Sequence, residues 1–272
     1  MTPDLFKISN FNGVAAGQTA TITIPAQGIY RKLVLIYKES GTAVTLSNMQ
    51  AAITEIRLKI NGKIQQRYSA AELIAINALY GKTFLDGRLP IFFAQPWRRQ
   101  ALGEDVFRWG MAAVQSFQVE VDIAAGRTAP SIECLCYWQQ GEEAMGTIRK
   151  FRRFNLPVTA TGENVWMPPV LDAYVGVHAL SSNITDVKVL VDNTEKRNSE
   201  VVDLHDLMDD QNLVAQSGYT HVLFDPSRRF EDVLAMTKPG EPNNAVQDYR
   251  FIFTMGAATG FDLLTETVGA RD

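Results

Sequence analysis

The sequence predicts an all-β fold made of two similar domains in series, each an antiparallel sandwich or barrel with one short helix. Two observations lead to this prediction. Short alternating strands are separated by proline, glycine and asparagine turns, and helices do not alternate with strands as they do in a parallel α/β fold. The chain also repeats itself at a spacing of about 130 residues, which is the size of a whole domain and too long for a solenoid repeat.

The repeat is visible in three segments of the N-terminal half, each of which has a counterpart in the C-terminal half. Because the spacing between the partners is nearly the same in all three pairs, a tandem duplication explains them together. The pairs are Ile53–Asn61 with Ile184–Asp192, Phe93–Arg99 with Leu223–Arg229, and Phe117–Val121 with Tyr249–Phe253.

In the N-terminal half, alternation of apolar and polar residues predicts strands, and the first of them, Thr19–Ile24, is rich in β-branched residues. A capping box at Ser69 and Glu72 begins a helix, which Gly81 ends. The further strands expected here are Arg31–Tyr37 after a turn at 25–28, Ile53–Ile60 before the Asn61-Gly62 turn, Val119–Ile123 and Ile132–Trp138.

The C-terminal half follows the same order. A proline and a tyrosine five residues apart, Pro25 with Tyr30 and Pro169 with Tyr174, lead into the second strand of each half. The elements expected are strands at Val165–Met167, Tyr174–Leu180 and Val187–Val191, and a helix that starts near Ser199. We therefore assign the domains to residues 1–145 and 146–272, with the boundary within 141–160.

Composition limits the function. With 46% hydrophobic and 21% charged residues, the chain is typical of a soluble globular protein. Its net charge of −4 argues against a general nucleic-acid binder, which needs basic surface to neutralise phosphates. No stretch reaches the 18 apolar residues of a membrane span, and Met1–Phe6 lacks the features of a secretory signal.

No catalytic motif is present, so we expect no enzyme activity and assign no catalytic, cofactor-binding or metal-binding residues. Each of the three histidines has its own explanation. His178 lies in an apolar strand and is expected to be a hydrogen-bonded structural residue. His205 and Asp209 share a helix face, where an exposed pair is favoured over a two-ligand site. His221 precedes a strand and has no evident partner.

Several other polar groups have a structural explanation. The carboxylates Glu120 and Asp122 alternate along one strand and give only a weak indication of glycoside hydrolysis, which needs two groups across a cleft. Cys134 and Cys136 are expected to be small apolar strand residues, because no further Cys or nearby His completes a metal site. A solvated helix face accounts for Asp203, Asp206, Asp209 and Asp210.

Basic and aromatic residues leave alternatives open. Arg98-Arg99 and Arg228-Arg229 occupy matching places in the two halves, where they either fix a loop through acidic partners or lie at subunit contacts. The run Arg149–Arg153 is expected to be a solvated linker or to form salt bridges between the domains, rather than to bind phosphate or lipid. Either subunit interfaces or the core bury the aromatics Phe92, Phe93, Trp97, Phe107 and Trp109.

Three segments carry a resemblance to a known family. They are Val14–Gly17 before an alternating strand, the strand and turn Ile56–Lys63, and the crossing between the halves, Ile148–Phe154. In these segments, and in order and size over most of its length, the chain resembles the double jelly-roll major capsid proteins of tailless, membrane-containing icosahedral phages. The corticovirus type, within the adenovirus and tectivirus capsid lineage, is the most similar. The region from Asp86 to Ser116 departs most.

The resemblance implies two tandem eight-stranded jelly-roll barrels in a major capsid protein. Three chains would form a trimer whose six barrels make a pseudo-hexagonal tile of an icosahedral virion shell around an internal membrane. The implied partners are further copies of the chain, vertex or penton proteins, and minor capsid or membrane proteins; lipid contact is left open, and no specific nucleic acid is expected. The chain would be made in the host cytoplasm. No cofactor is expected, and the structural calcium that accompanies corticovirus-type shells has no recognisable site here.

Two other classes of function remain as alternatives. Some glycan-cleaving amidases and carbohydrate-binding proteins also use two packed jelly rolls, so fold alone does not decide between them and a capsid protein. A phage spike or bacterial surface module is the third hypothesis. A secreted glycan enzyme usually carries an export signal and disulfides, which this sequence does not show.

Overall fold

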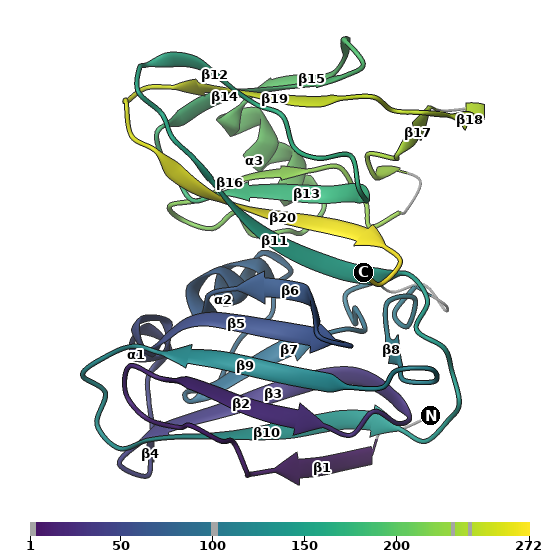
Figure 1. The fold of residues 1–272 in the computed structure, drawn as a ribbon. Coiled ribbons are helices and arrows are strands. Elements are labelled where there is room, and N and C mark those ends of the chain that lie inside the picture. The colour runs from purple at the N-terminus through teal and green to yellow at the C-terminus, as the bar shows by residue number, and fades with distance from the viewer. Residues whose placement is uncertain (1–3, 99–102, 230–231, 239–240) are drawn as a thin grey trace. The chain divides into compact units, whose positions relative to one another are not determined.

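Both halves of the chain form a sandwich of two antiparallel sheets (Figure 1). The structure is a computed structural model, and it describes residues 4–98, 103–229, 232–238 and 241–272. The first compact unit comprises Met1–Ala78, Lys82–Phe151 and Gly269–Asp272, and the second comprises Leu79–Gly81 and Arg152–Val268. Within the described ranges no helix has both the length and the apolar character needed to cross a membrane.

The first unit begins with strand β1 and ends its sandwich with strand β10. Its elements are β1 (Asp4–Ile8), β2 (Thr19–Ile24), β3 (Ile29–Glu39), β4 (Thr42–Ala43), α1 (Leu46–Ala52), β5 (Ile53–Ile60), β6 (Lys63–Tyr68), α2 (Ala70–Leu79), β7 (Arg88–Phe92), β8 (Trp109–Gly110), β9 (Phe117–Ile123) and β10 (Pro130–Gln139).

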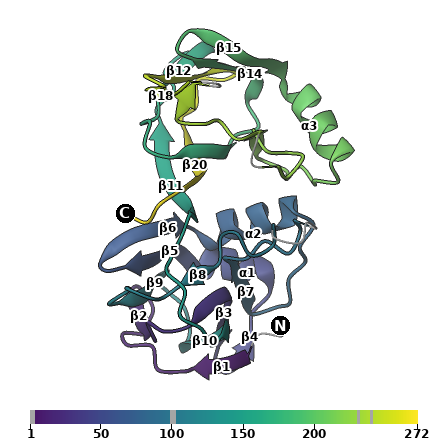
Figure 2. The same cartoon turned by 90° about the vertical axis from the view of Figure 1, so that its right-hand side faces the viewer.

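Strand β11 begins in the first unit and continues into the second, in which helix α3 follows strand β15 (Figure 2). The remaining elements are β11 (Ile148–Leu156), β12 (Gly162–Trp166), β13 (Ala173–Ala179), β14 (Ile184–Val191), β15 (Thr194–Glu200), α3 (Val201–Asp210), β16 (Thr220–Leu223), β17 (Thr237–Lys238), β18 (Glu241–Ala245), β19 (Tyr249–Met255) and β20 (Phe261–Gly269).

Strand order is the same in both units. In the first, β1, β10, β3 and β7 are neighbours in one sheet, and β2, β9, β5 and β6 in the other. In the second, the corresponding sheets are β11, β20, β13, β16 and β12, β19, β14, β15. If the short strands β4 and β8 and the separate hairpin β17–β18 are left aside, the strand orders among the described residues of each unit are 1-8-3-6 and 2-7-4-5. This is the topology of an eight-stranded jelly roll, so the predicted fold class is confirmed.

Local details differ from the predictions. The first unit contains a second helix, α1, which was not predicted because seven residues are too few to show helical periodicity. The strand expected at Val165–Met167 is β12, which begins at Gly162, three residues before the predicted start, and ends at Trp166. Ser199 belongs to β15, and α3 begins two residues later, where Glu200 and Asp203 form a capping box. The capping box of α2, between Ser69 and Glu72, is confirmed.

The duplication extends to single residues. Strands β5 and β14 have the same sequence of buried and exposed positions, and so do β9 and β19. The ladder between β5 and β9 is irregular between Ile53 and Glu55, and the ladder between β14 and β19 is irregular between Ile184 and Asp186. Since the sequence repeat pairs Ile53 with Ile184, the irregularity falls at the same place in both copies, and the two copies keep one register.

The turn after each of these strands is also the same. Asn61 has a positive φ of 51°, and its Oδ1 accepts hydrogen bonds from the backbone N–H groups of Gln115 (2.9 Å) and Ser116 (3.1 Å). At the equivalent place Asp192 has a φ of 46° and accepts from Gln247 (2.8 Å) and Asp248 (3.0 Å). Asn and Asp suit this position because they tolerate left-handed backbone and supply an acceptor.

The predicted proline–tyrosine spacing also has a structural role. The hydroxyl of Tyr30 donates to the carbonyl of Pro25 at 2.7 Å, and that of Tyr174 donates to Pro169 at 3.1 Å. Each ring packs edge-on against the first residue of β9 or β19, which is Phe117 or Tyr249. The tyrosine thus ties the turn to the core in both units.

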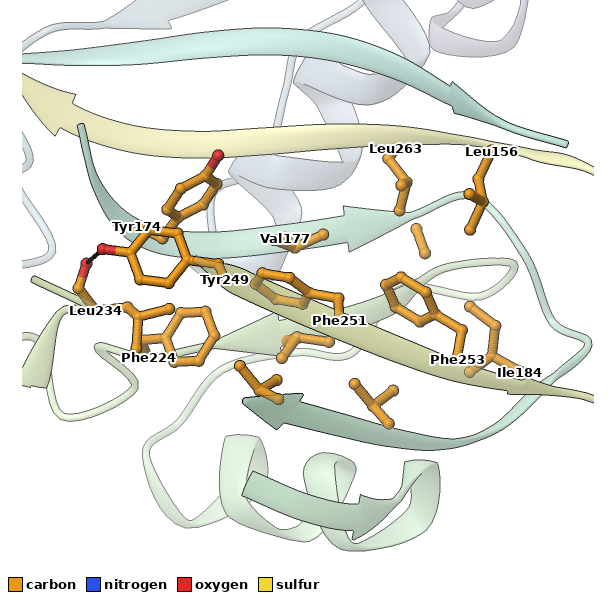
Figure 3. Packing of buried hydrophobic residues seen from close by; sticks show 14 of the residues in the cluster. Leu156, Tyr174, Val177, Ile184, Phe224, Leu234, Tyr249, Phe251, Phe253 and Leu263 are labelled. Atoms are coloured by element: carbon orange, nitrogen blue, oxygen red, sulfur yellow. Dashed lines mark hydrogen bonds between the residues drawn. The ribbon is translucent and has the colours of Figure 1, made fainter. Parts of the chain in front are cut away.

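The core of the second unit lies between its two sheets (Figure 3). Phe251 and Phe253 project from β19 toward Val177 of β13 and Leu263 of β20, and all four are fully buried. Burying an aromatic or branched aliphatic side chain stabilises a fold by about 1.5–3 kcal/mol. The alternation of buried and half-buried residues along β19 therefore fixes which face of the sheet looks outward.

Candidate assembly surface

The outer face of the β2–β9–β5–β6 sheet carries a network of charges, which we call the first wall: Glu55, Arg57, Lys59, Glu120 and Asp122. Arg57 lies at its centre and donates to Glu120 and Asp122 at 2.8 Å each, and to Glu55. Lys59 also bonds Glu120. All five side chains are at least two-thirds buried, with exposures of 13–30%.

Charge pairing shifts the pKa values of these groups. The hydrogen bond from Arg57 lowers the pKa of Asp122, more than burial raises it. The hydrogen bonds that Arg57 donates to Asp122 in turn raise the pKa of the Arg57 guanidinium. The charges of the first wall are therefore paired within one sheet, where Arg67 of β6 supplies the third positive charge through its salt bridge to Glu55 at 2.8 Å.

The equivalent face of the second unit is different. We call it the second wall: Val165, Lys188, Leu190, Ile252 and Thr254. Leu190 stands where the first wall has Lys59, Ile252 where it has Glu120, and Thr254 where it has Asp122. Val165 is opposite Ile252 in the ladder between β12 and β19, and it is 52% exposed.

Two duplicated sheets thus present unlike outer faces. The first wall is a closed ionic network, whereas the second wall offers neighbouring apolar side chains in the same register. Val165 is exposed, and Leu190 and Ile252 are half-buried beside it, so this face offers apolar surface that another protein can cover. The sequence pattern did not identify Ile252 and Leu190 as part of an interaction surface, because half-buried apolar residues on strands are common.

The paired arginines do not form matching surfaces. Arg98 is buried and bonds the side chain of Gln95, so it fixes the loop that precedes it, and the subunit-contact hypothesis is wrong for this residue. Arg228 has a left-handed backbone with a φ of 63° and donates to the carbonyl of Gln211 at 3.2 Å. Arg229 is exposed. Arg99 lies outside the described residues.

The aromatic residues proposed for an interface belong to the core instead. Phe93 and Trp109 stack with ring centroids 4.1 Å apart, and both are fully buried. Trp97 and Phe107 are buried as well, and only Phe92 is half-buried. The interface hypothesis is wrong for the four buried rings, because they are already covered within the chain.

The basic run is a strand and not a solvated linker. Arg149 and Lys150 are buried in the first unit, where Lys150 Nζ lies 2.7 Å from Asp272 Oδ1. Further along β11, the second unit holds Arg152, which pairs with Asp172 at 2.9 Å. The run therefore forms salt bridges, but those described here lie inside each unit, whereas the prediction placed them between the domains.

Sequence reasoning missed the partner of His221. Its Nδ1 lies 2.9 Å from Nδ1 of His178, and both rings are buried. His178 is thus a hydrogen-bonded strand residue, as predicted. His205 is half-buried on α3. The two histidines of the pair are far apart in sequence, and only the register of β13 with β16 brings them together.

Other predicted structural roles hold. The carboxylates of α3, which are Asp203, Asp206, Asp209 and Asp210, are all exposed. Cys134 and Cys136 are buried on β10 with sulfur atoms 3.9 Å apart, and the hydrogen bond from Cys136 and burial raise the pKa of Cys134. Glu120 and Asp122 belong to the first wall. In the part of the chain that the structure describes, no three His, Cys, Asp or Glu side chains group as metal ligands.

Comparison with known families identifies the chain. The family model of the viral coat protein P2 N-terminal domain matches residues 6–139, and that of the P2 C-terminal domain matches residues 148–271. The chain belongs to the viral coat protein P2 family. A search of curated proteins found no match. Membership of this coat protein family confirms the resemblance to capsid proteins, whereas nothing in the comparison with families supports the glycan alternative.

Solved structures agree with this family on the fold. The major capsid protein P2 from bacteriophage PM2 aligns with a TM-score of 0.87 at 15% identity, covering 99% of this chain and 98% of that one. The STIV MCP aligns with a TM-score of 0.71 at 12% identity, covering 98% and 97%. The PBCV-1 virus capsid gives 0.64 at 10%, covering 98% and 94%. At such identities the likeness shows the double jelly-roll fold.

Proposed function

We propose that this coat protein is a major capsid protein whose copies assemble into trimers. Three double jelly rolls would supply six barrels to a pseudo-hexagonal tile of an icosahedral virion shell around an internal membrane. The observation that carries the proposal is the match of both P2 coat domains to a chain with two jelly rolls of the same strand order. Residues 1–145 and 146–272 are the proposed domains.

The second wall is the proposed surface on which a neighbouring copy lies. A half-exposed valine such as Val165 would contribute about 1 kcal/mol when a partner covers it, which is roughly half the value for full burial. The first wall has no comparable apolar surface. Self-assembly through shape and apolar contact also needs no catalytic residue, cofactor or specific nucleic acid, and we propose none.

The remaining partners follow from the shell. Vertex proteins and minor capsid or membrane proteins would contact the trimers at their edges, and assembly would follow synthesis in the host cytoplasm. In a trimer, one surface of each copy meets a different surface of the next copy, and the ring closes when the same contact repeats around the three-fold axis.

The test compares two lysine substitutions at the same register position. Val165→Lys places a charge on the second wall, and Thr21→Lys places one on the first wall, because Thr21 is opposite Glu120 as Val165 is opposite Ile252. Light scattering coupled to size exclusion should show trimers for the unmodified protein and for Thr21→Lys. Val165→Lys should shift the protein toward monomers at micromolar concentration while circular dichroism stays unchanged.

Two results would count against the proposal. If the unmodified protein is a monomer at micromolar concentration, the proposed trimer is wrong. If both Val165→Lys and Thr21→Lys still form trimers, the second wall is not part of the interface, although the proposed trimer is supported.

A further inference from the structure

The three histidines of the chain lie close together in the second unit. His178 is on β13 and His221 on β16, and these two residues are directly opposite each other in the antiparallel ladder. His205, on α3, is near enough for its charge to act on His221. None of these residues takes part in the assembly surfaces described above, so the cluster has no role yet.

The geometry of the pair demands one shared proton. The two Nδ1 atoms are 2.9 Å apart, and a hydrogen bond forms only if one nitrogen donates and the other accepts. Glu266 Oε2 lies 3.5 Å from Nε2 of His178, where no hydrogen bond forms, but the nearby carboxylate favours a proton on that nitrogen over the bare Nε2 of His221. His178 Nδ1 is then the acceptor and His221 Nδ1–H the donor.

This arrangement leaves His221 with a bare ring nitrogen. Its Nε2 has no hydrogen-bond partner among the described residues, and its side chain is buried. The ring of Tyr219 stacks on it with centroids 5.6 Å apart. Burial, followed by the charges of His178 and His205, lowers the pKa of His221 below its ordinary value, and Glu266 raises it less.

Other polar groups surround the pair. The hydroxyl of Tyr80, which the second unit includes, lies 3.3 Å from Glu266 Oε2. Arg197 of β15 reaches β16 and donates to the carbonyl of Leu223 at 2.7 Å. Strand β16 has only four residues and lies at the end of its sheet, where its ladder partner is β13. An edge strand this short depends on few contacts to stay in place.

We propose that His178 and His221 form a proton-sensitive clasp, which holds edge strand β16 on β13 in neutral solution and loosens it in acid. When acid adds a proton at Nε2 of His221, a positive charge is buried with no hydrogen-bond partner among the described residues. The ring reaches water only if the strands move apart. The inference rests on this pair alone and stands whether or not the protein forms trimers.

The direction of the pH effect follows from linkage. The folded protein binds a proton at His221 less readily than the unfolded chain does. The stabilising contribution is therefore complete above the ordinary histidine pKa of about 6.5 and is lost as the pH falls below it. One such group changes the ratio of closed to open protein by up to about tenfold for each pH unit.

Hydrogen exchange of the β16 amides tests the clasp in the full-length protein. We expect their protection factors to fall by about tenfold between pH 7.5 and pH 5.5, while those of β19 stay constant. In the double variant His178→Asn with His221→Asn, an amide pair replaces the imidazoles, and the protection factors of β16 should no longer fall with pH. His205→Asn is the matched control, and its protection factors should fall as those of the unmodified protein do.

Equal protection at both pH values, or the same fall in the double variant, would overturn the clasp. If the double variant does not fold, nitrogen-15 spectra of the unmodified protein decide. The clasp requires His221 to titrate below the ordinary histidine value. A titration at or above about 6.5 would refute it.

Discussion

The turn residue Asn61 offers a prediction whose size follows from its contacts. Replacing it by alanine removes two hydrogen bonds to backbone N–H groups, from Gln115 and Ser116, which cost about 0.5–1.5 kcal/mol each. Alanine must also adopt the left-handed backbone of this position, which costs about 1 kcal/mol more than for asparagine. Asn61→Ala should therefore lower the free energy of unfolding by about 2–4 kcal/mol.

Two further variants separate these contributions. Asn61→Gly loses the hydrogen bonds without the backbone strain and should cost about 1–3 kcal/mol. Asn61→Asp keeps the acceptor and should cost the least. The same series at Asp192, with Asp192→Asn as the conservative change, should repeat the ranking in the second unit, because Gln247 and Asp248 donate there in the same way.

Urea denaturation followed by fluorescence and circular dichroism measures the series, and the variants at Asn61 and Asp192 should shift the transition of their own unit. The midpoint should move while the slope of each transition stays constant. Equal stability of Asn61→Ala and Asn61→Asp would show that the hydrogen bonds to the Asn61 acceptor contribute nothing.

Three other variants probe contacts described above. Tyr174→Phe leaves the Pro169 carbonyl without its donor and should cost about 1–2 kcal/mol in thermal unfolding, and an unchanged melting temperature would contradict this. Arg57→Gln should cost about 1–2 kcal/mol at pH 7. Because the pKa of Asp122 is lowered by Arg57, that contribution is complete above about pH 4 and is lost below it, so the difference from the unmodified protein should narrow at pH 3; a constant difference would refute it. Ser69→Ala removes a helix cap and should lower the free energy of unfolding, measured by urea denaturation, by about 1 kcal/mol. An unchanged free energy would show that the capping box of α2 does not stabilise the protein.

The sequence was sufficient for the strands with a clear alternation. Strands β2 and β5 begin and end at the predicted residues, because their apolar side chains all face the core and their turns carry glycine, proline or asparagine. Strand β15 was missed. Its sequence, Thr194–Glu200, is polar at every position, so no pattern of period two marks it, and it pairs with β14 as the last strand of its sheet.

The candidate surfaces were less accessible from the sequence. The first wall contains Glu120 and Asp122, which were noticed but could not be connected to Arg57 on another strand without the register of β5 with β9. The contact of His178 with His221 has the same cause. A residue pattern reports which face a side chain occupies, whereas contacts between strands depend on pairing over long sequence separations.

The shared register of the two jelly rolls has a consequence for folding. A strand such as β5 could in principle pair with β19, since its buried positions match those of β14, and cross-pairing of this kind is a characteristic failure of tandem domains. The outward residues oppose such errors: Arg57 would lie opposite Ile252 and Lys59 opposite Arg250, and neither charge would have a carboxylate beside it. The divergence of the walls thus favours pairing of each strand with the strands of its own unit.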